Sequence, residues 1–157
     1  RGNVNTRLAK LDAGDYDAIL LACAGLQRLG FDARIRARLA PPDFLPAVAQ
    51  GAIAVECRAN DAATCALFAP LDHAATHRCV AVERAMNLRL AGSCQVPIAG
   101  YCTEDDGLWT LRALVGDERS GEILRAEGTA DAASLATLGE RIAEDLLAQG
   151  ADRLLAR

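Results

Sequence analysis

The chain has 157 residues, of which 52% are apolar and only 4% aromatic, so it can bury a core built mostly from small side chains. A formal net charge of −4 and a pI of about 5.2 argue against nucleic acid as a partner. The sequence contains no apolar run of the roughly 18 residues that a bilayer span needs, and no secretory signal, so no membrane partner is expected.

The first part of the chain has a helix–strand–helix pattern. Apolar residues recur at helical spacing in residues 3–13, behind an asparagine that can cap the helix, and Gly14 ends it. The nearly continuous apolar run at 16–22 is typical of a parallel strand buried on both faces. A short helix is expected at 24–29. This order is typical of the end of an α/β unit whose first strands lie outside this chain.

The middle of the chain combines extended segments with one short helix. Three prolines interrupt residues 34–50, where we expect a strand followed by an extended crossing segment. Residues 51–57 are predicted to form a further strand. Asn60 or Asp61 then caps a short helix that a proline ends.

The remainder of the chain has the pattern of an α+β domain. A long helix is expected from Asp72 to about Leu90, and Asp131 begins a last long helix that Gly150 closes. The apolar stripe of the first of these helices consists of Cys79, Val82, Met86 and Leu90. Three strands lie between the two helices, joined by short turns that contain glycine and favour antiparallel hairpins. Their expected ranges are 96–104, 108–115 and 122–128.

We therefore divide the chain into three parts. Residues 1–50 are predicted to be the C-terminal part of an α/β domain, and residues 51–71 a strand and helix that cross back toward a first domain. Residues 72–157 are predicted to be an α+β domain with a three-stranded antiparallel sheet covered by helices. Because the sequence starts with Arg1 rather than Met, we expect it to be part of a longer protein.

Six cysteines occur without a CxxC pair and without the spacing of zinc ribbons or fingers. They are Cys23, Cys57, Cys65, Cys79, Cys94 and Cys102. We expect a reducing, cytoplasmic location in which most of them are small buried hydrophobic residues. Cys57 and Cys102 lie in strand-like runs, and three others lie in or beside helical runs. Only Cys94 lies in a turn of glycine and serine.

Cys94 is the leading candidate for a functional residue. It follows Gly92 and Ser93, which leave space around the sulfur, and Pro97 prevents the helix from continuing. A thiol in such a loop can be reached by a large molecule, which favours a covalent attachment point over a core cysteine. The Gly-Ser-Cys triplet alone is more typical of an ordinary loop cysteine, and only the whole segment 83–99 argues for attachment.

Three arginines are candidate ligands of an anion. Arg1 precedes the first helix, Arg7 lies on it, and Arg28 lies at the end of the next short helix. Guanidinium groups bind carboxylates in a bidentate manner and stay charged at any working pH. Taken alone, the three are best interpreted as solvated surface arginines, which is the usual environment of arginine.

The segment 83–99 resembles the cofactor-attachment signature of the porphobilinogen deaminases, also called hydroxymethylbilane synthases. Its sequence is Glu-Arg-Ala-Met-Asn-Leu-Arg-Leu-Ala-Gly-Ser-Cys-Gln-Val-Pro-Ile-Ala. Residues 1–12 resemble the arginine-bearing helix of that family, and residues 16–29 its next strand and helix. Residues 46–58 resemble the segment that re-enters the family's first domain. The resemblance covers essentially the whole chain.

This resemblance implies a transferase of porphyrin and haem biosynthesis. Such an enzyme joins four porphobilinogen units into hydroxymethylbilane, a linear tetrapyrrole, with loss of ammonia. It carries a dipyrromethane cofactor as a thioether, here on Cys94, and the cofactor is the primer for the growing pyrrole chain. The resemblance also implies that Arg1, Arg7 and Arg28 bind acetate and propionate groups of that chain.

The resemblance further implies that the α/β part is a substrate-binding domain similar to periplasmic binding proteins, and that the full-length enzyme is a monomer. The family's catalytic aspartate lies in its N-terminal domain, so no catalytic residue is assigned in this chain. We therefore expect the chain to be inactive by itself.

Two other classes of function remain open. The chain could be a non-catalytic module that binds a small carboxylate, or a structural domain in which Cys94 stays unmodified. His73 and His77 lie four residues apart on one helix, but no third ligand has suitable spacing. No metal site is therefore predicted.

Overall fold

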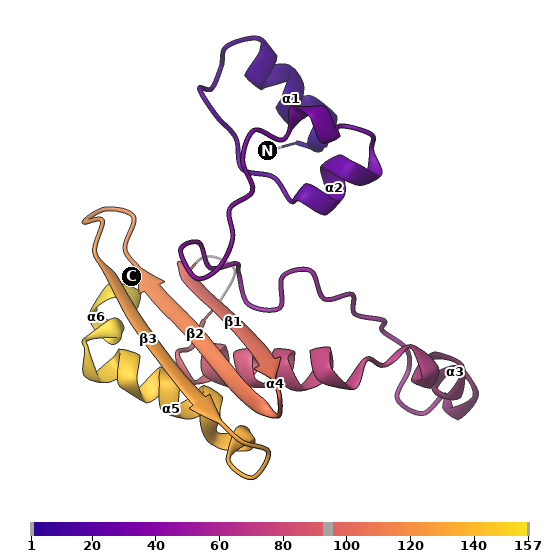
Figure 1. Cartoon of the computed structure of the whole chain (residues 1–157), viewed down its shortest axis with the longest axis vertical. Coiled ribbons are helices and arrows are strands. Elements are labelled where there is room, and N and C mark those ends of the chain that lie inside the picture. The colour runs from indigo at the N-terminus through magenta and orange to yellow at the C-terminus, as the bar shows by residue number, and fades with distance from the viewer. Residues whose placement is uncertain (1, 93–95, 157) are drawn as a thin grey trace. The chain divides into compact units, whose positions relative to one another are not determined.

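The computed structural model describes residues 2–92 and 96–156 (Figure 1). The chain separates into two compact units, residues 1–40 and residues 41–157, and each is described by itself.

The first unit contains two short helices, α1 (Val4–Asp12) and α2 (Cys23–Arg28), and one turn of 3-10 helix, η1 (Asp32–Arg34). The side chain of Asn3 caps α1 by accepting the N–H of Thr6 at 2.9 Å. Leu8 of α1 and Leu26 of α2 are buried. The helices predicted at 3–13 and 24–29 are confirmed.

The strands predicted before residue 96 are wrong. Among the described residues, the first strand begins at Ile98, and the runs 16–22 and 51–57 have no regular secondary structure. Leu20 is 61% exposed and Ile53 is 91% exposed. A strand covered on both faces needs neighbouring strands for its backbone hydrogen bonds and layers for its side chains. Neither is provided for these runs within the described chain, so an α/β fold of residues 1–50 is not confirmed.

The second unit begins with an extended segment and then continues with regular elements. The helices are α3 (Ala62–Phe68), the 3-10 turn η2 (Ala69–Leu71), α4 (Ala74–Arg89), α5 (Leu135–Ala148) and α6 (Ala151–Leu155). The strands are β1 (Ile98–Asp105), β2 (Leu108–Gly116) and β3 (Ile123–Ala130). They form an antiparallel sheet in the order β1-β2-β3. The predicted three-stranded α+β domain is therefore confirmed.

Local signals explain where these elements begin and turn. Asp106 and Gly107 both have positive φ, 48° and 78°, as a two-residue hairpin between β1 and β2 requires. The predicted cap of α4 is displaced by one residue, because the side chain of His73 accepts the N–H of Thr76. Asp72 instead contacts Nδ1 of His77 at 3.0 Å.

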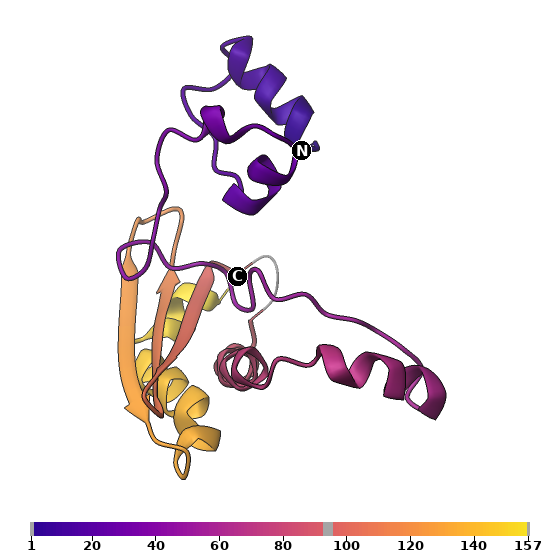
Figure 2. The same ribbon diagram turned by 45° about the vertical axis from the view of Figure 1, so that its right-hand side comes forward.

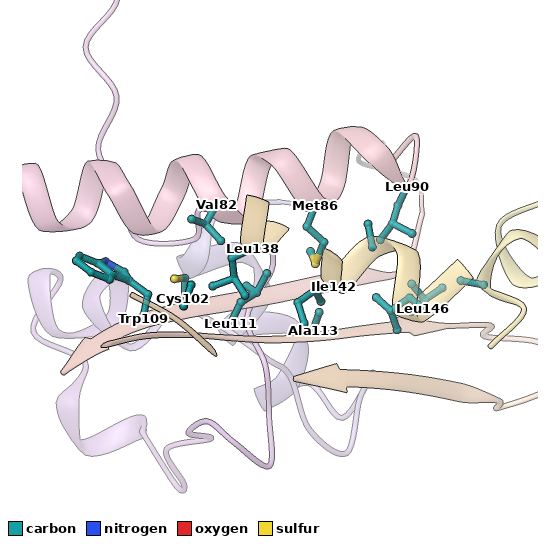
Figure 3. Close-up of a cluster of buried hydrophobic side chains, with 14 of the residues drawn as sticks. Val82, Met86, Leu90, Cys102, Trp109, Leu111, Ala113, Leu138, Ile142 and Leu146 are labelled. Carbon is teal, nitrogen blue, oxygen red and sulfur yellow. The ribbon is translucent and has the colours of Figure 1, made fainter. Parts of the chain in front are cut away.

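The core of the second unit lies between the sheet and two helices. Helices α4 and α5 pack on the same face of the sheet (Figure 2). Alternate residues of β2 point into this layer, and they are Trp109, Leu111, Ala113 and Val115. Met86 of α4 and Leu138, Ile142 and Leu146 of α5 meet them (Figure 3). The predicted apolar faces of both helices are therefore confirmed.

The two helices cross at very short range. A Cβ placed on Gly139 of α5 would lie 2.3 Å from the backbone oxygen of Val82, so only glycine fits there.

No helix in the described part of the chain combines the length and the apolar character that a bilayer crossing requires.

Candidate functional site

The predicted attachment loop follows a well-defined helix end. The N–H of Gly92 donates to the carbonyl of Asn87 at 2.8 Å, and the N–H of Ala91 donates to the carbonyl of Leu88 at 3.0 Å. This is the hydrogen-bond pattern of a Schellman motif, in which one residue has the left-handed conformation. Here that residue is Ala91, with φ of 51°. The motif turns the chain away from the axis of α4 just before residue 93.

Gly92 is favoured by close contacts rather than by its φ angle. A Cβ at this position would fall against the ends of the Asn87 and Ile98 side chains, which would have to move aside. The backbone of Gly92 therefore fits between the end of α4 and the start of β1. The sequence predicted that Gly92 leaves space beside a sulfur, and the structure adds that it allows helix and strand to approach each other.

The other side of the loop is held by the sheet. The N–H of Ile98 donates to the carbonyl of Val96 at 2.8 Å, and the N–H of Gly116 in β2 donates to the carbonyl of Pro97 at 2.9 Å. The segment between Gly92 and Val96 therefore starts and ends at fixed points of the core. Ser93 and Cys94 themselves lie outside the described residues, as does Arg1.

Two other cysteines of this unit are withdrawn from solvent to different degrees, Cys102 being buried and Cys79 half-buried. Cys102 of β1 is 5% exposed, and burial is the main cause that raises the pKa of its thiol. Burial also raises the pKa of the Cys79 thiol. The prediction that Cys102 packs in an apolar strand is confirmed, whereas the expectation that most of the cysteines are buried is wrong, because Cys102 alone is buried among the five that the structure describes. Because thiolates are the nucleophilic form, neither thiol is suited to attack an electrophile near neutral pH.

Glu83 is a buried carboxylate that holds three segments together. It is 5% exposed. Its Oε1 accepts the N–H of Cys102 at 2.8 Å, and its Oε2 accepts the N–H of Ala49 at 2.7 Å. Both partners found for the Glu83 carboxylate are therefore backbone amides. Burial raises the pKa of Glu83, and the two amide hydrogen bonds oppose that shift.

A groove of about 470 Å³ lies where the segment 46–52 passes α4 and β1. Its lining residues include two acidic residues, Glu83 and Glu104, and two cysteines, Cys79 and Cys102. None of the described residues that line it is basic. The groove is therefore a poor match for a ligand rich in carboxylates.

The predicted anion ligands that the structure describes lie in the first unit. Arg7 is half-buried on α1, and its Nη2 donates to the carbonyl of Leu20 at 3.0 Å. Arg28 is the last residue of α2 and is exposed. Arg34, which the sequence did not single out, forms an ion pair with Asp12 and ties η1 to α1. The bond from Arg7 uses one of the five N–H donors of a guanidinium.

Metal ligation has no support among the described residues. They contain no group of three or more His, Cys, Asp or Glu side chains that could hold an ion. His73 caps α4 and His77 contacts Asp72, so both predicted histidines have local partners.

Comparison with known proteins identifies relatives for both parts of the chain. Residues 1–66 match the family model for the porphobilinogen deaminase, dipyrromethane cofactor binding domain. Residues 77–148 match the model for the porphobilinogen deaminase, C-terminal domain. The chain is 55% identical to a porphobilinogen deaminase of Xanthomonas euvesicatoria pv. vesicatoria (strain 85-10), over 99% of this chain and 51% of that protein. It thus spans about half the length of this curated relative. The predicted dipyrromethane cofactor is confirmed by the description of the first model.

Proposed function

Since the chain belongs to the porphobilinogen deaminase family, we propose that the complete protein joins four porphobilinogen units into hydroxymethylbilane with loss of ammonia. Porphobilinogen and the growing linear pyrrole chain are its ligands. The observation that carries the proposal for this chain is the short loop after α4, whose two ends are fixed by hydrogen bonds of Gly92 and Pro97. We further propose a cytoplasmic, monomeric enzyme.

Cys94 is the proposed attachment residue. It is the cysteine of the 83–99 segment, between the Schellman turn at Gly92 and the start of β1. Cys79 and Cys102 are disfavoured because burial raises the pKa of both thiols. When bound, dipyrromethane supplies a covalently held primer to which pyrrole units are added. A loop with fixed ends limits the positions of such a group and lowers the entropic cost of each addition.

The first unit is proposed to bind the carboxylates of the pyrrole chain. Arg7 and Arg28 would each form charge-assisted hydrogen bonds with acetate or propionate groups, and we assign the same role to Arg1. The hydrogen bond from Arg7 to Leu20 orients the guanidinium relative to α1. These side chains hold the ligand and offset its negative charge.

Catalysis by the 157-residue chain alone is not proposed. The resemblance assigns the catalytic aspartate to the N-terminal domain of the family, and the chain corresponds to 51% of its relative. We propose that the chain carries the attachment residue and part of the anion site, and that it does not turn over porphobilinogen by itself.

The intact mass of the complete protein tests this function. After expression, the complete protein should carry the added mass of one dipyrromethane. Cys94→Ser should lose this mass and the activity, because a serine hydroxyl is not ionised near neutral pH. The matched control, Cys102→Ser, changes a buried thiol and should retain both.

Three results would contradict the proposal. An adduct that persists in Cys94→Ser and disappears in Cys102→Ser would show that the cofactor is attached to Cys102 and not to Cys94. A complete protein without added mass that binds small carboxylates would favour a non-catalytic binding module. Formation of hydroxymethylbilane by the 157-residue chain alone would show that the catalytic group lies within it.

A further inference from the structure

Two cysteines outside the attachment site face each other in the second unit. The sulfur atoms of Cys57 and Cys65 are 3.5 Å apart. Cys57 is exposed in the extended segment before α3, and Cys65 is half-buried within α3. The resemblance to porphobilinogen deaminases gives no role to this pair, and neither thiol belongs to the loop that contains Cys94.

A short turn brings the two thiols together. The N–H of Asp61 donates to the carbonyl of Arg58 at 3.1 Å. Asp61 then caps α3 by accepting the N–H of Thr64 at 3.1 Å. The thiol of Cys65 contacts the carbonyl of Arg58 at 3.6 Å. Because the turn and the helix cap share Asp61, the first turn of α3 is positioned beside the segment that carries Cys57.

We propose that Cys57 and Cys65 form a reversible disulfide when the protein meets hydrogen peroxide. The sulfur atoms would have to approach from 3.5 Å to a bond length of about 2.05 Å. Cys57 lies in an exposed segment without regular structure, so a shift of the backbone can supply this movement. The product would link this segment covalently to α3.

The oxidation balances in two steps. The thiolate of one cysteine attacks an oxygen of hydrogen peroxide, the O–O bond breaks, and a sulfenic acid and hydroxide form. The second sulfur, after losing its proton, attacks the sulfenic sulfur, and the S–S bond forms as hydroxide leaves. The two protons from the thiols convert both hydroxides to water. The thiols lose two electrons in total, and the peroxide gains them.

Other roles of the pair have less support in the structure. No third His, Cys, Asp or Glu completes a metal site with these thiols among the described residues. A hydrogen bond with Cys65 is the main cause that raises the pKa of Cys57. The raised pKa slows the attack of Cys57 on peroxide at neutral pH, so the oxidation is tested in weakly alkaline buffer, where more thiolate is present.

Peptide mapping of the reduced 157-residue chain tests the proposal. Trypsin cleaves after Arg38, Arg58 and Arg78, so Cys57 and Cys65 fall into the separate peptides 39–58 and 59–78, each with one cysteine. After mild peroxide treatment in weakly alkaline buffer and alkylation of free thiols, these two peptides should be linked. We expect this pair to exceed any other linked pair by at least tenfold, and dithiothreitol should separate it.

Matched variants show whether the link depends on this geometry. Cys57→Ser and Cys65→Ser should each abolish the intramolecular link, whereas Cys79→Ser should leave its yield unchanged within twofold. Circular dichroism of each variant checks that the total helix content of the chain is retained. Similar yields of links among all cysteines, or oxidation of Cys57 and Cys65 to separate sulfinic acids without a link, would overturn the proposal.

Discussion

The carboxylate of Glu83 accepts the backbone N–H of Cys102 at 2.8 Å inside the second unit. Its other oxygen accepts the N–H of Ala49, in a segment more than thirty positions earlier in the chain. A second hydrogen bond, from the N–H of Gly100 to the carbonyl of Pro46 at 3.2 Å, holds the same segment against β1. Glu83 therefore attaches an otherwise extended part of the chain to the α+β core.

Replacing Glu83 by Ala should destabilise the second unit. The substitution leaves one buried and one partly buried N–H without an acceptor, and we expect a loss of about 2–4 kcal/mol in the free energy of unfolding. Urea denaturation followed by circular dichroism measures it. Glu140→Ala, on the exposed face of α5, is the control and should change stability by less than about 0.5 kcal/mol. Equal effects of both variants would contradict this role.

The pH dependence of stability should report the raised pKa of Glu83. Burial raises the folded-state pKa above its ordinary value of 4.5, so the folded state binds this proton more tightly than the unfolded chain. Protonated Glu83 therefore contributes to the free energy of unfolding. This contribution is fully present below about pH 4.5 and is lost as the pH rises through the folded-state pKa. Denaturation between about pH 4 and pH 8 should show this decrease in the wild type and not in Glu83→Gln. An increase over that window, relative to Glu83→Gln, would show that the carboxylate is preferentially ionised in the folded state.

The α+β part of the fold could be predicted because its signals are local. The stripe of Val82, Met86 and Leu90 and the turn at Asp106-Gly107 lie within short stretches of sequence, and each strand pairs with the strand next to it in the chain. The strands at 16–22 and 51–57 were wrongly predicted because the same apolar runs form strands only where neighbouring strands are available.

Only part of the candidate site could be predicted from the sequence. The turn before Cys94 follows from the small residues that end α4, but the contact of Gly92 with Asn87 depends on a helix end that only the structure defines. The role of Glu83 was missed, although its spacing from Cys79 and Met86 places it on the apolar stripe. The contact between Cys57 and Cys65 depends on an irregular turn for which no periodic pattern exists.

The two residues before the attachment loop should respond in opposite ways to exchange of glycine and alanine. Ala91 has a left-handed backbone, so Ala91→Gly should stabilise the second unit by up to about 1 kcal/mol. Gly92→Ala would place a methyl group against the ends of the Asn87 and Ile98 side chains, and because both ends can move aside it should destabilise the unit by about 1 kcal/mol. Urea denaturation of both variants checks this. A stabilised Gly92→Ala would mean that the end of α4 has more space than these contacts allow.

Residues 72–157 are predicted to fold autonomously, whereas residues 1–50 should be less stable by themselves. The main buried cluster extends from Val82 to Leu154, while the buried apolar residues of the first unit are Leu8 and Leu26 among those described. Hydrogen exchange should therefore be slow at the amides of 75–90 and 131–149 and fast at 16–22. Equal or greater protection at 16–22 in the monomeric chain would contradict this difference.

Substitution of Arg7 and of Arg28 in the complete enzyme should show which arginine serves only to bind the pyrrole chain and which also stabilises the fold. Arg28 is exposed, so Arg28→Ala should weaken binding of the pyrrole chain while leaving the melting temperature unchanged. Arg7→Ala also removes the hydrogen bond to Leu20, so it should lower both the affinity for the pyrrole chain and the melting temperature. Each lost charged hydrogen bond costs roughly 1.5–3 kcal/mol, which corresponds to a rise in KM of about tenfold to a hundredfold.

Arg34 provides the matched control for these two variants, because its guanidinium is paired with Asp12. Arg34→Ala should lower the melting temperature with little change in KM, and Arg7→Lys should recover only part of the binding because a lysine cannot form a bidentate contact with a carboxylate. Steady-state elongation and thermal unfolding of all four variants give the two readouts. If Arg7→Ala and Arg28→Ala elongate the pyrrole chain with the KM of the wild type, both arginines are surface residues and the anion site lies elsewhere.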